Sequence, residues 1–297
     1  MIVALSGSSG LIGSALVRMF GRRGDEVRPL VRREARKPYE ISWDPQGDAI
    51  DASRLEGVDV VINLAGENLA QHWSSAVKHR IRDSRVKGTA LLSRTIASLA
   101  AKPAVLLSGS AIGIYGSRRD EPLDEASTPG DDFLANVCKE WEAATNPASE
   151  VAIKVTHLRT GLVLSTDGGL LPKLLLPFRF GIGGKLGKGR QWMSWISLAD
   201  YVEAVCHLAT DLSLPGAVNM VSPHPVTNEE FTDTLANILR RPAMIPVPGF
   251  ALKFAMGEMA EETALASQKV RPHRLLEAGF HYQQPTLDKA LRSLLVH

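Results

Sequence analysis

The sequence predicts an α/β protein: a doubly wound parallel sheet followed by a small, mainly helical C-terminal part. Three observations predict it. The chain opens on a continuous apolar run at residues 2–5, as a buried parallel strand requires. Predicted strands and helices then alternate as far as residue 165, which is typical of a sheet covered by helices on both faces. Residues 222–297 instead indicate short helices joined by proline-containing turns.

The alternating region supplies the elements of the predicted sheet. After the first strand, we predict strands at residues 26–31, 39–43, 59–65, 104–107 and 151–158. Helical periodicity predicts one helix that ends near Gly24, a long helix over 74–100 and a third over 132–145. We therefore expect a first domain over 1–221 and a smaller domain over 222–297.

The pattern changes over residues 166–192, which are rich in glycine, leucine and proline. Two interpretations of this segment stand: a mobile loop that closes over a ligand as a lid, and a plain connector. Beyond it, Ser197–Asp200 and Thr227–Glu230 both have the pattern of a capping box, a serine or threonine followed three residues later by an acidic residue. Each predicts the start of a helix.

The strongest chemical signal is a glycine-spaced turn directly after the first strand. Its residues are Gly7, Ser8, Ser9, Gly10, Leu11, Ile12 and Gly13. In a dinucleotide-binding turn, the first glycine permits the tight turn, the second lets the backbone approach a pyrophosphate, and the third lets the next helix pack closely. The helix N-terminus adds free N–H groups and a positive dipole end. Glycine triplets also mark ordinary turns, but here a strand precedes and a helix follows, so we predict that these residues bind a dinucleotide.

The end of the second strand bears on which dinucleotide binds. An NAD site usually places Asp or Glu there, whereas this chain has Arg32 and Arg33, and Glu34 follows only past the strand. Guanidinium groups suit a 2′-phosphate, so we expect NADP(H) rather than NAD, with Arg32 and Arg33 meeting that phosphate. In the alternative interpretation the arginines belong to a solvated basic loop with Arg36 and Lys37.

The bulk properties exclude several classes of function. A net charge of +2 over 297 residues gives no reason to expect nucleic-acid or membrane partners, and no apolar run approaches 18 residues. Eight histidines are scattered without a metal-binding spacing, so no metal is expected. Two cysteines suit a reducing compartment, so we expect a cytoplasmic protein. We also expect a small molecule as its substrate. The sequence leaves a homodimer open.

Several stretches resemble the short-chain dehydrogenase/reductase superfamily, and together they are similar to its atypical "epimerase family" members. These have an NAD(P)-binding Rossmann domain of epimerase/dehydratase type and a short C-terminal domain of unknown function. The stretches are 7–13, 63–68, 82–85, 108–116, 159–164, 191–196 and 274–280. The resemblance covers almost the whole chain. It implies that Leu64, Ala65, Gly66 and Glu67 line the cofactor and that the C-terminal part covers the substrate.

The resemblance fails at the residues that usually carry the chemistry. Typical members have Tyr-x-x-x-Lys on a helix, where the lysine holds the nicotinamide ribose and lowers the pKa of the tyrosine. Here Lys139 stands at the lysine position but Ala135 at the tyrosine position. The superfamily's serine corresponds best to Ser110, although Ser108 competes, so Ser110 and Lys139 are the catalytic candidates. For Tyr115 we favour a packed ring with a bonded hydroxyl.

Two functions follow from this mixture. The first is an NADP(H)-dependent oxidoreductase or epimerase that acts on a small hydroxyl- or carbonyl-bearing molecule or a nucleotide-sugar-like substrate, with hydride transfer carried by the cofactor. The second is a non-catalytic NADPH-binding regulatory or sensor protein, in which the cofactor stabilises the bound form. Ala135 favours the second, whereas Lys139 and the predicted lid favour the first.

Overall fold

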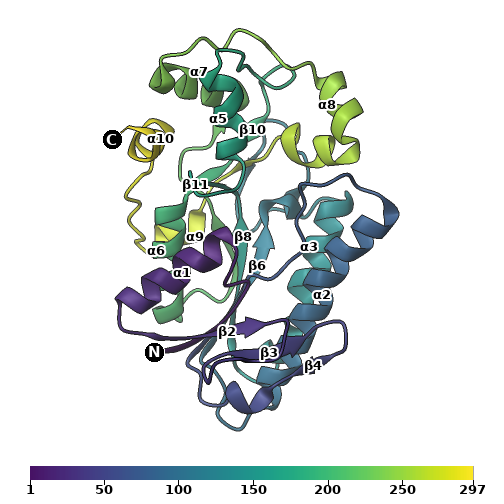
Figure 1. The fold of residues 1–297 in the computed structure, drawn as a ribbon, viewed down its shortest axis with the longest axis vertical. Coiled ribbons are helices and arrows are strands. Elements are labelled where there is room, and N and C mark those ends of the chain that lie inside the picture. The colour runs from purple at the N-terminus through teal and green to yellow at the C-terminus, as the bar shows by residue number, and fades with distance from the viewer. Residues whose placement is uncertain (297) are drawn as a thin grey trace.

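The computed structural model describes residues 1–296, which form an eight-stranded sheet with helices on both faces (Figure 1). The strand order is β12-β8-β6-β5-β1-β2-β3-β4, and every neighbouring pair is parallel except β3 with β4. The strands are β1 (Ile2–Ser6), β2 (Glu26–Val31), β3 (Ile41–Asp44), β4 (Ala49–Ile50), β5 (Val60–Asn63), β6 (Val105–Ala111), β8 (Lys154–Thr160) and β12 (Gly216–Met220). The predicted doubly wound parallel sheet is confirmed.

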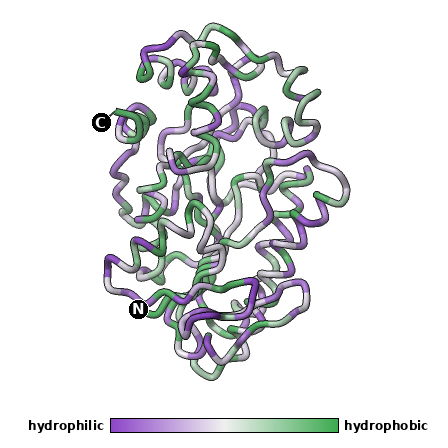
Figure 2. Tube along the Cα trace, viewed as in Figure 1, coloured by the Kyte–Doolittle hydropathy of each residue, from purple (hydrophilic) through white to green (hydrophobic). Residues whose placement is uncertain are grey.

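Helices cover both faces of the sheet, and two of them lie over the centre of each face. The helices are α1 (Leu11–Arg22), α2 (Ser75–Ser98), α3 (Phe133–Ala143), α4 (Asn146–Ser149), α5 (Leu171–Arg179), α6 (Leu198–Thr210), α7 (Asn228–Leu239), α8 (Gly249–Met256), α9 (His273–Glu277) and α10 (Leu287–Leu295). Side chains alternate along β1, so Val3 and Leu5 pack with α1 and α6. Ala4 packs on the opposite face with Leu92 and Ile96 of α2. Hydrophobic residues, coloured green, lie along this central sheet (Figure 2).

The order of the strands places the ligand-binding edge. β1 pairs with β2 on one side and with β5 on the other, so the winding direction reverses at β1. In open parallel sheets, ligands bind outside the carboxyl ends of the strands at such a switch point. The glycine turn follows β1 directly, and the 64–67 segment follows β5. The fold therefore brings these two sequence-predicted segments to one edge.

The predicted segment 166–192 contains a helix, α5, where the sequence indicated a loop. Proline in this segment favoured a loop. Pro172, however, lies in the first turn of α5, where proline is tolerated because its missing N–H would have no partner there. The strand predicted over 151–158 is also displaced and runs from Lys154 to Thr160. Ala152 just before it has a φ of +64°, a turn conformation that ends the preceding segment.

The C-terminal part shares a core with α5. Leu171 and Leu175 of α5 pack in one cluster with Phe231 and Leu235 of α7 and with Leu291 of α10. α8 lies at the periphery and keeps Phe250 and Phe254 exposed (Figures 1 and 2). The short elements are β7 (Pro122–Leu123), β9 (Leu162–Leu164), β10 (Trp192–Met193), β11 (Trp195–Ser197), β13 (Val226–Thr227) and β14 (Lys269–Val270), with 3₁₀ turns at Ala52–Arg54 and Ile112–Tyr115 and a π-helical turn at Ala260–Ala264.

Strand β14 ties the C-terminal part to the loop after β6. It pairs in parallel with β7, and the amide of Gln268 donates to the carbonyls of Ile112 and Gly116. The backbone N–H of Ser267 donates to Ser117 Oγ at 3.1 Å. A segment from the end of the chain therefore holds the loop that leads into α3.

The two predicted capping boxes differ in the structure. At α7, Thr227 and Glu230 make both reciprocal bonds of the box. At α6, Ser197 Oγ accepts from the backbone N–H of Asp200, but the Asp200 carboxylate accepts from the backbone N–H groups of Gln283 and Gln284. Both helices begin where the sequence predicted, and the second carboxylate serves a tertiary contact instead.

Candidate cofactor-binding site

The glycine turn is shaped so tightly that two of its glycines admit no side chain. A Cβ atom on Gly13 would lie 2.1 Å from the carbonyl oxygen of Gly7. Gly7 itself has a φ of +71°, and a Cβ atom there would lie 2.9 Å from the backbone of Leu64. Gly10 is less constrained, with 3.3 Å to the nearest atom. The turn therefore presses against both its own helix and the end of β5.

The N-terminus of α1 is open to an anion. No side chain caps it, and its first turn carries no acidic residue. Its free N–H groups and dipole end point to the edge of the sheet where β1 ends. The tight backbone and the free N–H groups fit a dinucleotide's pyrophosphate.

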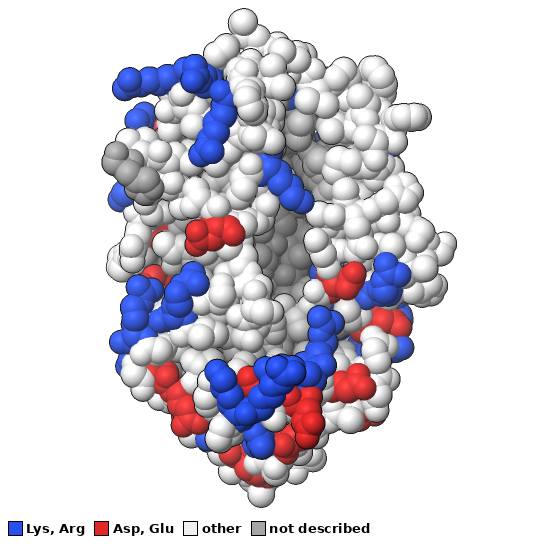
Figure 3. All heavy atoms as spheres, viewed as in Figure 1, with Lys and Arg blue, Asp and Glu red and all other residues white. Residues whose placement is uncertain are grey.

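A cleft of about 300 Å³ begins at this turn and crosses to α3. Figure 3 shows a groove on this face of the molecule, between the half that carries α6 and the half that carries α3. The cleft is lined by Gly7, Gly10, Leu11, Ile12, Gly13, Leu64, Leu69, Arg85, Gly109, Ser110, Ala111, Gly113, Leu134, Val137, Cys138, Trp141, Thr160 and Tyr201. Of the predicted cofactor residues it brings together Gly7, Gly10, Leu11, Ile12, Gly13 and Leu64. The lining does not include the other predicted cofactor residues, which are Ser8, Ser9, Arg32, Ala65, Gly66 and Glu67, and Arg32 lines a different cavity.

A buried serine fixes the two sides of the cleft floor. Ser6 Oγ donates to Asn63 Oδ1 at 2.6 Å and accepts from the backbone N–H groups of Leu64 and Ala65, each at 3.1 Å. Asn63 in turn donates to Thr89 of α2 at 2.8 Å. These bonds hold the ends of β1 and β5 in register, so the segment from Leu64 onward keeps a fixed place beside the glycine turn.

The two arginines after β2 differ in their freedom. Arg33 donates from Nη1 and Nη2 to the two carboxylate oxygens of Glu40, each at 2.8 Å, and these bonds lower the pKa of Glu40 to about 2. Glu40 therefore occupies the donors with which Arg33 was predicted to meet a 2′-phosphate, which leaves Arg32 better placed for that contact. Arg32 is exposed and makes no hydrogen bond or ion pair within residues 1–296. Basic side chains gather over β2 and β3 in Figure 3.

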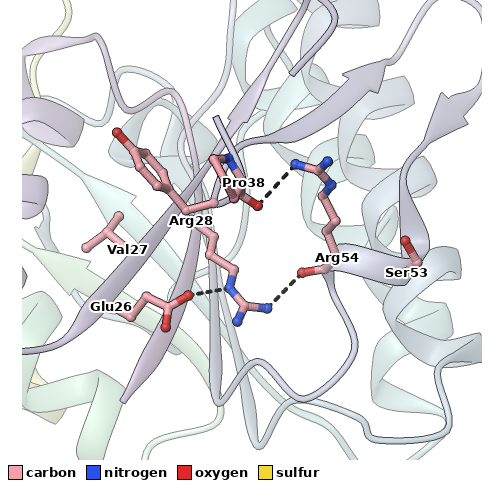
Figure 4. Close-up of a pocket in the computed structure, with 7 residues that line it drawn as sticks. Glu26, Val27, Arg28, Pro38, Ser53 and Arg54 are labelled. Carbon is pink, nitrogen blue, oxygen red and sulfur yellow. Dashed lines mark hydrogen bonds and ion pairs between the residues drawn. The ribbon is translucent and has the colours of Figure 1, made fainter. Parts of the chain in front are cut away.

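A separate cavity lies away from the candidate site. It measures about 580 Å³ and lies beside β2 and the Ala52–Arg54 turn (Figure 4). Its Arg28 donates to Glu26 and to the Arg54 carbonyl, and Arg54 donates to the carbonyls of Pro38 and Glu40. The guanidinium groups therefore brace the loops around β2.

Helix α3 presents a different face to the cleft than the sequence predicted. Lys139 is exposed, and its Nζ donates to the Gly130 carbonyl at 3.2 Å outside the cleft. Leu134 and Cys138, each one position earlier than Ala135 and Lys139, line the cleft instead. The spacing of four is thus met by a leucine and a cysteine. Burial raises the pKa of the Cys138 thiol to about 12, which leaves it protonated.

Ser110 lies at the cleft and belongs to a buried polar network. Its Oγ donates to Glu142 Oε1 at 2.7 Å, and Arg159 donates to both oxygens of Glu142 at 2.9 and 3.0 Å. Burial alone would raise the pKa of Glu142, but the hydrogen bonds from Arg159 hold it below its usual value. Ser108 is fully buried and does not line the cleft. Of the two serines, Ser110 is thus the one that lines the cleft, and its catalytic role stays a prediction.

Tyr115 has the structural role that the sequence favoured. Its ring is fully buried, and its hydroxyl donates to Asn219 Oδ1 at 2.7 Å and accepts from Arg159 at 3.0 Å. Burial raises the pKa of the hydroxyl to about 12. The tyrosine thus braces the network from behind and does not reach the cleft.

Sequence reasoning missed four polar or aromatic residues that line the cleft. Arg85 and Trp141 form the wall on the side of α2 and α3, and Thr160 and Tyr201 lie on the other side. Trp141 had a signal, because Leu134, Val137, Cys138 and Trp141 recur at helical spacing and mark the inward face of α3. The others follow from tertiary packing alone.

Two kinds of feature are absent from residues 1–296. No three histidine, cysteine or acidic side chains are grouped so that they would hold a metal ion. No helix in the same range has the length and apolarity needed to cross a membrane.

Known proteins match this chain over almost its whole length. Residues 3–220 match the NAD dependent epimerase/dehydratase family, and residues 247–294 match a domain of unknown function, DUF1731. The epimerase family protein Mb2239 of Mycobacterium bovis is 42% identical and covers 98% of this chain and 96% of its own. The crystal structure of human epimerase family protein SDR39U1 with NADPH has a TM-score of 0.91, with 33% identity over 99% of both chains. A nucleoside-diphosphate sugar epimerase of Corynebacterium glutamicum has a TM-score of 0.83 and 36% identity, over 99% of this chain and 58% of that one.

Proposed function

Because the chain belongs to the NAD-dependent epimerase/dehydratase family, we propose that it binds NADP(H) in the cleft between the glycine turn and α3. The observation that carries this is the turn itself, where Gly7 and Gly13 admit no Cβ atom and the N-terminus of α1 is left open. The solved relative with NADPH supports the same cofactor.

Arg32 supports NADPH over NADH. It is the arginine after β2 whose fork is free within residues 1–296, and a 2′-phosphate accepts two charge-assisted bonds from such a group. Titrating NADPH and NADH against tryptophan fluorescence tests this. We expect R32Q to weaken NADPH about tenfold, the scale of one charged hydrogen bond, and to leave NADH unchanged. R33Q is the matched control, and a native preference for NADH would contradict the proposal.

The reaction that this site supports best is hydride exchange with a small hydroxyl- or carbonyl-bearing molecule or a nucleotide-sugar-like substrate. When bound, the nicotinamide supplies the hydride chemistry. The Ser110 hydroxyl donates its hydrogen bond to Glu142. The lone pairs of its Oγ can therefore accept a hydrogen bond from a substrate hydroxyl and orient that hydroxyl. The lowered pKa of Glu142 makes that carboxylate a fixed acceptor and a weak base.

A non-catalytic NADPH-binding role is the second candidate, favoured by the inward face of α3. Leu134, Val137 and Cys138 stand where a proton donor is needed, and the pKa of the Cys138 thiol, raised to about 12 by burial, keeps it from serving as a base. A screen of carbonyl compounds and nucleotide sugars separates the two. Turnover that is lost in S110A and kept in K139A supports the enzyme. Tight NADPH binding without turnover across the panel supports the sensor.

A further inference from the structure

Arg85 is a cation held rigidly in the wall of the cleft. It comes from α2, and its Nη1 donates to the Ile81 carbonyl at 3.0 Å while its Nη2 donates to the Glu67 carbonyl at 3.1 Å. Its guanidinium carbon lies 5.2 Å from the ring centroid of Trp141. A Cβ atom on Gly66 would come within 3.1 Å of the same group. The guanidinium is therefore fixed between a backbone segment and an indole.

This charge has no carboxylate partner within residues 1–296, although other arginines nearby do. Arg82, one turn earlier on the same helix, pairs with Asp83 and Glu140. The side chain of Arg85 instead spends two of its five N–H donors on neutral carbonyls. A buried cation costs free energy unless it is paired, and burial in this wall lowers the pKa of Arg85. The Arg85 guanidinium is thus held in place, and its remaining N–H donors are available to a ligand.

The surroundings of Arg85 indicate which chemical group of the ligand would contact it. The remainder of the wall is apolar or weakly polar, from Leu134 and Cys138 to Gly109. The charge of Glu67 acts on Arg85 and raises its pKa against the larger effect of burial, but the Glu67 carboxylate accepts from Gln71 and makes no ion pair with Arg85. Arginine forks match the planar oxygens of carboxylates and phosphates.

We propose that Arg85 binds an oxyanion of the ligand held in this cleft, so that the ligand's negative charge completes the pair that the protein lacks. The proposal rests on the cofactor site proposed above. A phosphate or carboxylate has two sources here: the pyrophosphate of the dinucleotide and an acidic group of the substrate. Both offer the same chemistry to Arg85, and binding measurements distinguish them.

The first experiment compares R85Q and R85K with the control R80Q. Arg80 lies on the same helix, is exposed and makes no hydrogen bond or ion pair in the described residues, so R80Q matches the charge change. The ligands are NADPH, 2′-phospho-ADP-ribose and 2′-AMP, which lacks the pyrophosphate. If Arg85 binds the pyrophosphate, R85Q weakens the first two about tenfold to a hundredfold and leaves 2′-AMP unchanged. R85K recovers only part of the loss, because an ammonium lacks the planar fork.

The second experiment tests the substrate as the source. The NADPH complex is titrated with oxalate and with inorganic phosphate, and the wild type is expected to bind one of them while R85Q binds neither. Thermal unfolding without ligand checks that R85K retains the native fold. If the wild type fails to bind NADPH, both the proposed function and this inference fail. If it binds NADPH but R85Q and R85K match R80Q for every ligand and anion, only the role of Arg85 is overturned.

Discussion

Gly13 shows what one missing methyl group does in this molecule. The G13A variant would place Cβ 2.1 Å from the Gly7 carbonyl oxygen, a contact that only a backbone shift relieves. We expect a loss of stability of about 1–3 kcal/mol, as for other overpacked sites, and loss of NADPH binding because the turn must open. Urea unfolding and a fluorescence titration measure the two effects.

Gly21, on the same helix, is the matched control. A Cβ atom there meets nothing within 4 Å, so G21A is expected to stabilise α1 by about 0.5–1 kcal/mol and to leave NADPH affinity unchanged. Equal effects of the two substitutions would refute the steric account.

The Arg33–Glu40 pair makes a pH prediction. The hydrogen bonds from Arg33, with one from the backbone N–H of Arg36, lower the pKa of Glu40 to about 2 from a usual value of 4.5. The charged form is thus favoured by folding, so its contribution to stability is fully present above pH 4.5 and disappears as the pH falls through 2. In urea unfolding we expect the gap between wild type and E40Q to narrow over that range. A gap that is constant with pH would count against the pair.

At the scale of elements, the start of α3 depends on the far end of the chain. Asp132 accepts from the backbone N–H of Ala135, and Glu262 accepts from those of Phe133 at 3.3 Å and Leu134 at 2.8 Å. The π-helical turn thereby caps the helix that lines the cleft. We expect E262A to cost about 1–2 kcal/mol in the free energy of unfolding, as the loss of a helix cap does.

The neighbouring residue controls for a simple charge effect. Glu261 is exposed and pairs with Lys253 on α8, so E261A removes the same charge without touching α3. Its effect is expected to stay within about 0.5 kcal/mol, as for exposed ion pairs generally. A similar loss in both variants would show that the cap contributes nothing.

The elements also show how far sequence reasoning reached. Strand β2 begins and ends at the predicted residues, although Leu30 is its one buried residue. The turn at Gly7–Gly13 was predictable because its glycine spacing between a strand and a helix is a local property of the sequence. The inward face of α3 was not predicted from the helix's own apolar spacing. The prediction used the lysine of a family pattern instead, and Lys139 lies outside the cleft. The partner of Arg33 was out of reach, since nothing local links it to Glu40 seven residues on.

At the scale of the whole molecule, the shared core predicts one unfolding transition. α5 lies before residue 221, yet it packs with α7 and α10 beyond it, so neither part keeps its core if the other unfolds. NADPH at a hundred times its Kd stabilises the folded state by about 2.7 kcal/mol, which for a chain of this length raises Tm by roughly 4 °C. Calorimetry with and without NADPH is the measurement. Two transitions, of which NADPH shifts only the first, would mean independent domains.

The attachment of β14 has a consequence for how the protein is made. A nascent chain emerges from the ribosome N-terminus first, so the glycine turn is synthesised long before the residues that hold the loop entering α3. Ser267 and Gln268 can reach that loop only after the 266 residues before them have been translated. One wall of the cleft is therefore completed late in synthesis, and a messenger truncated before the codon for Ser267 would yield a sheet without a finished nucleotide site.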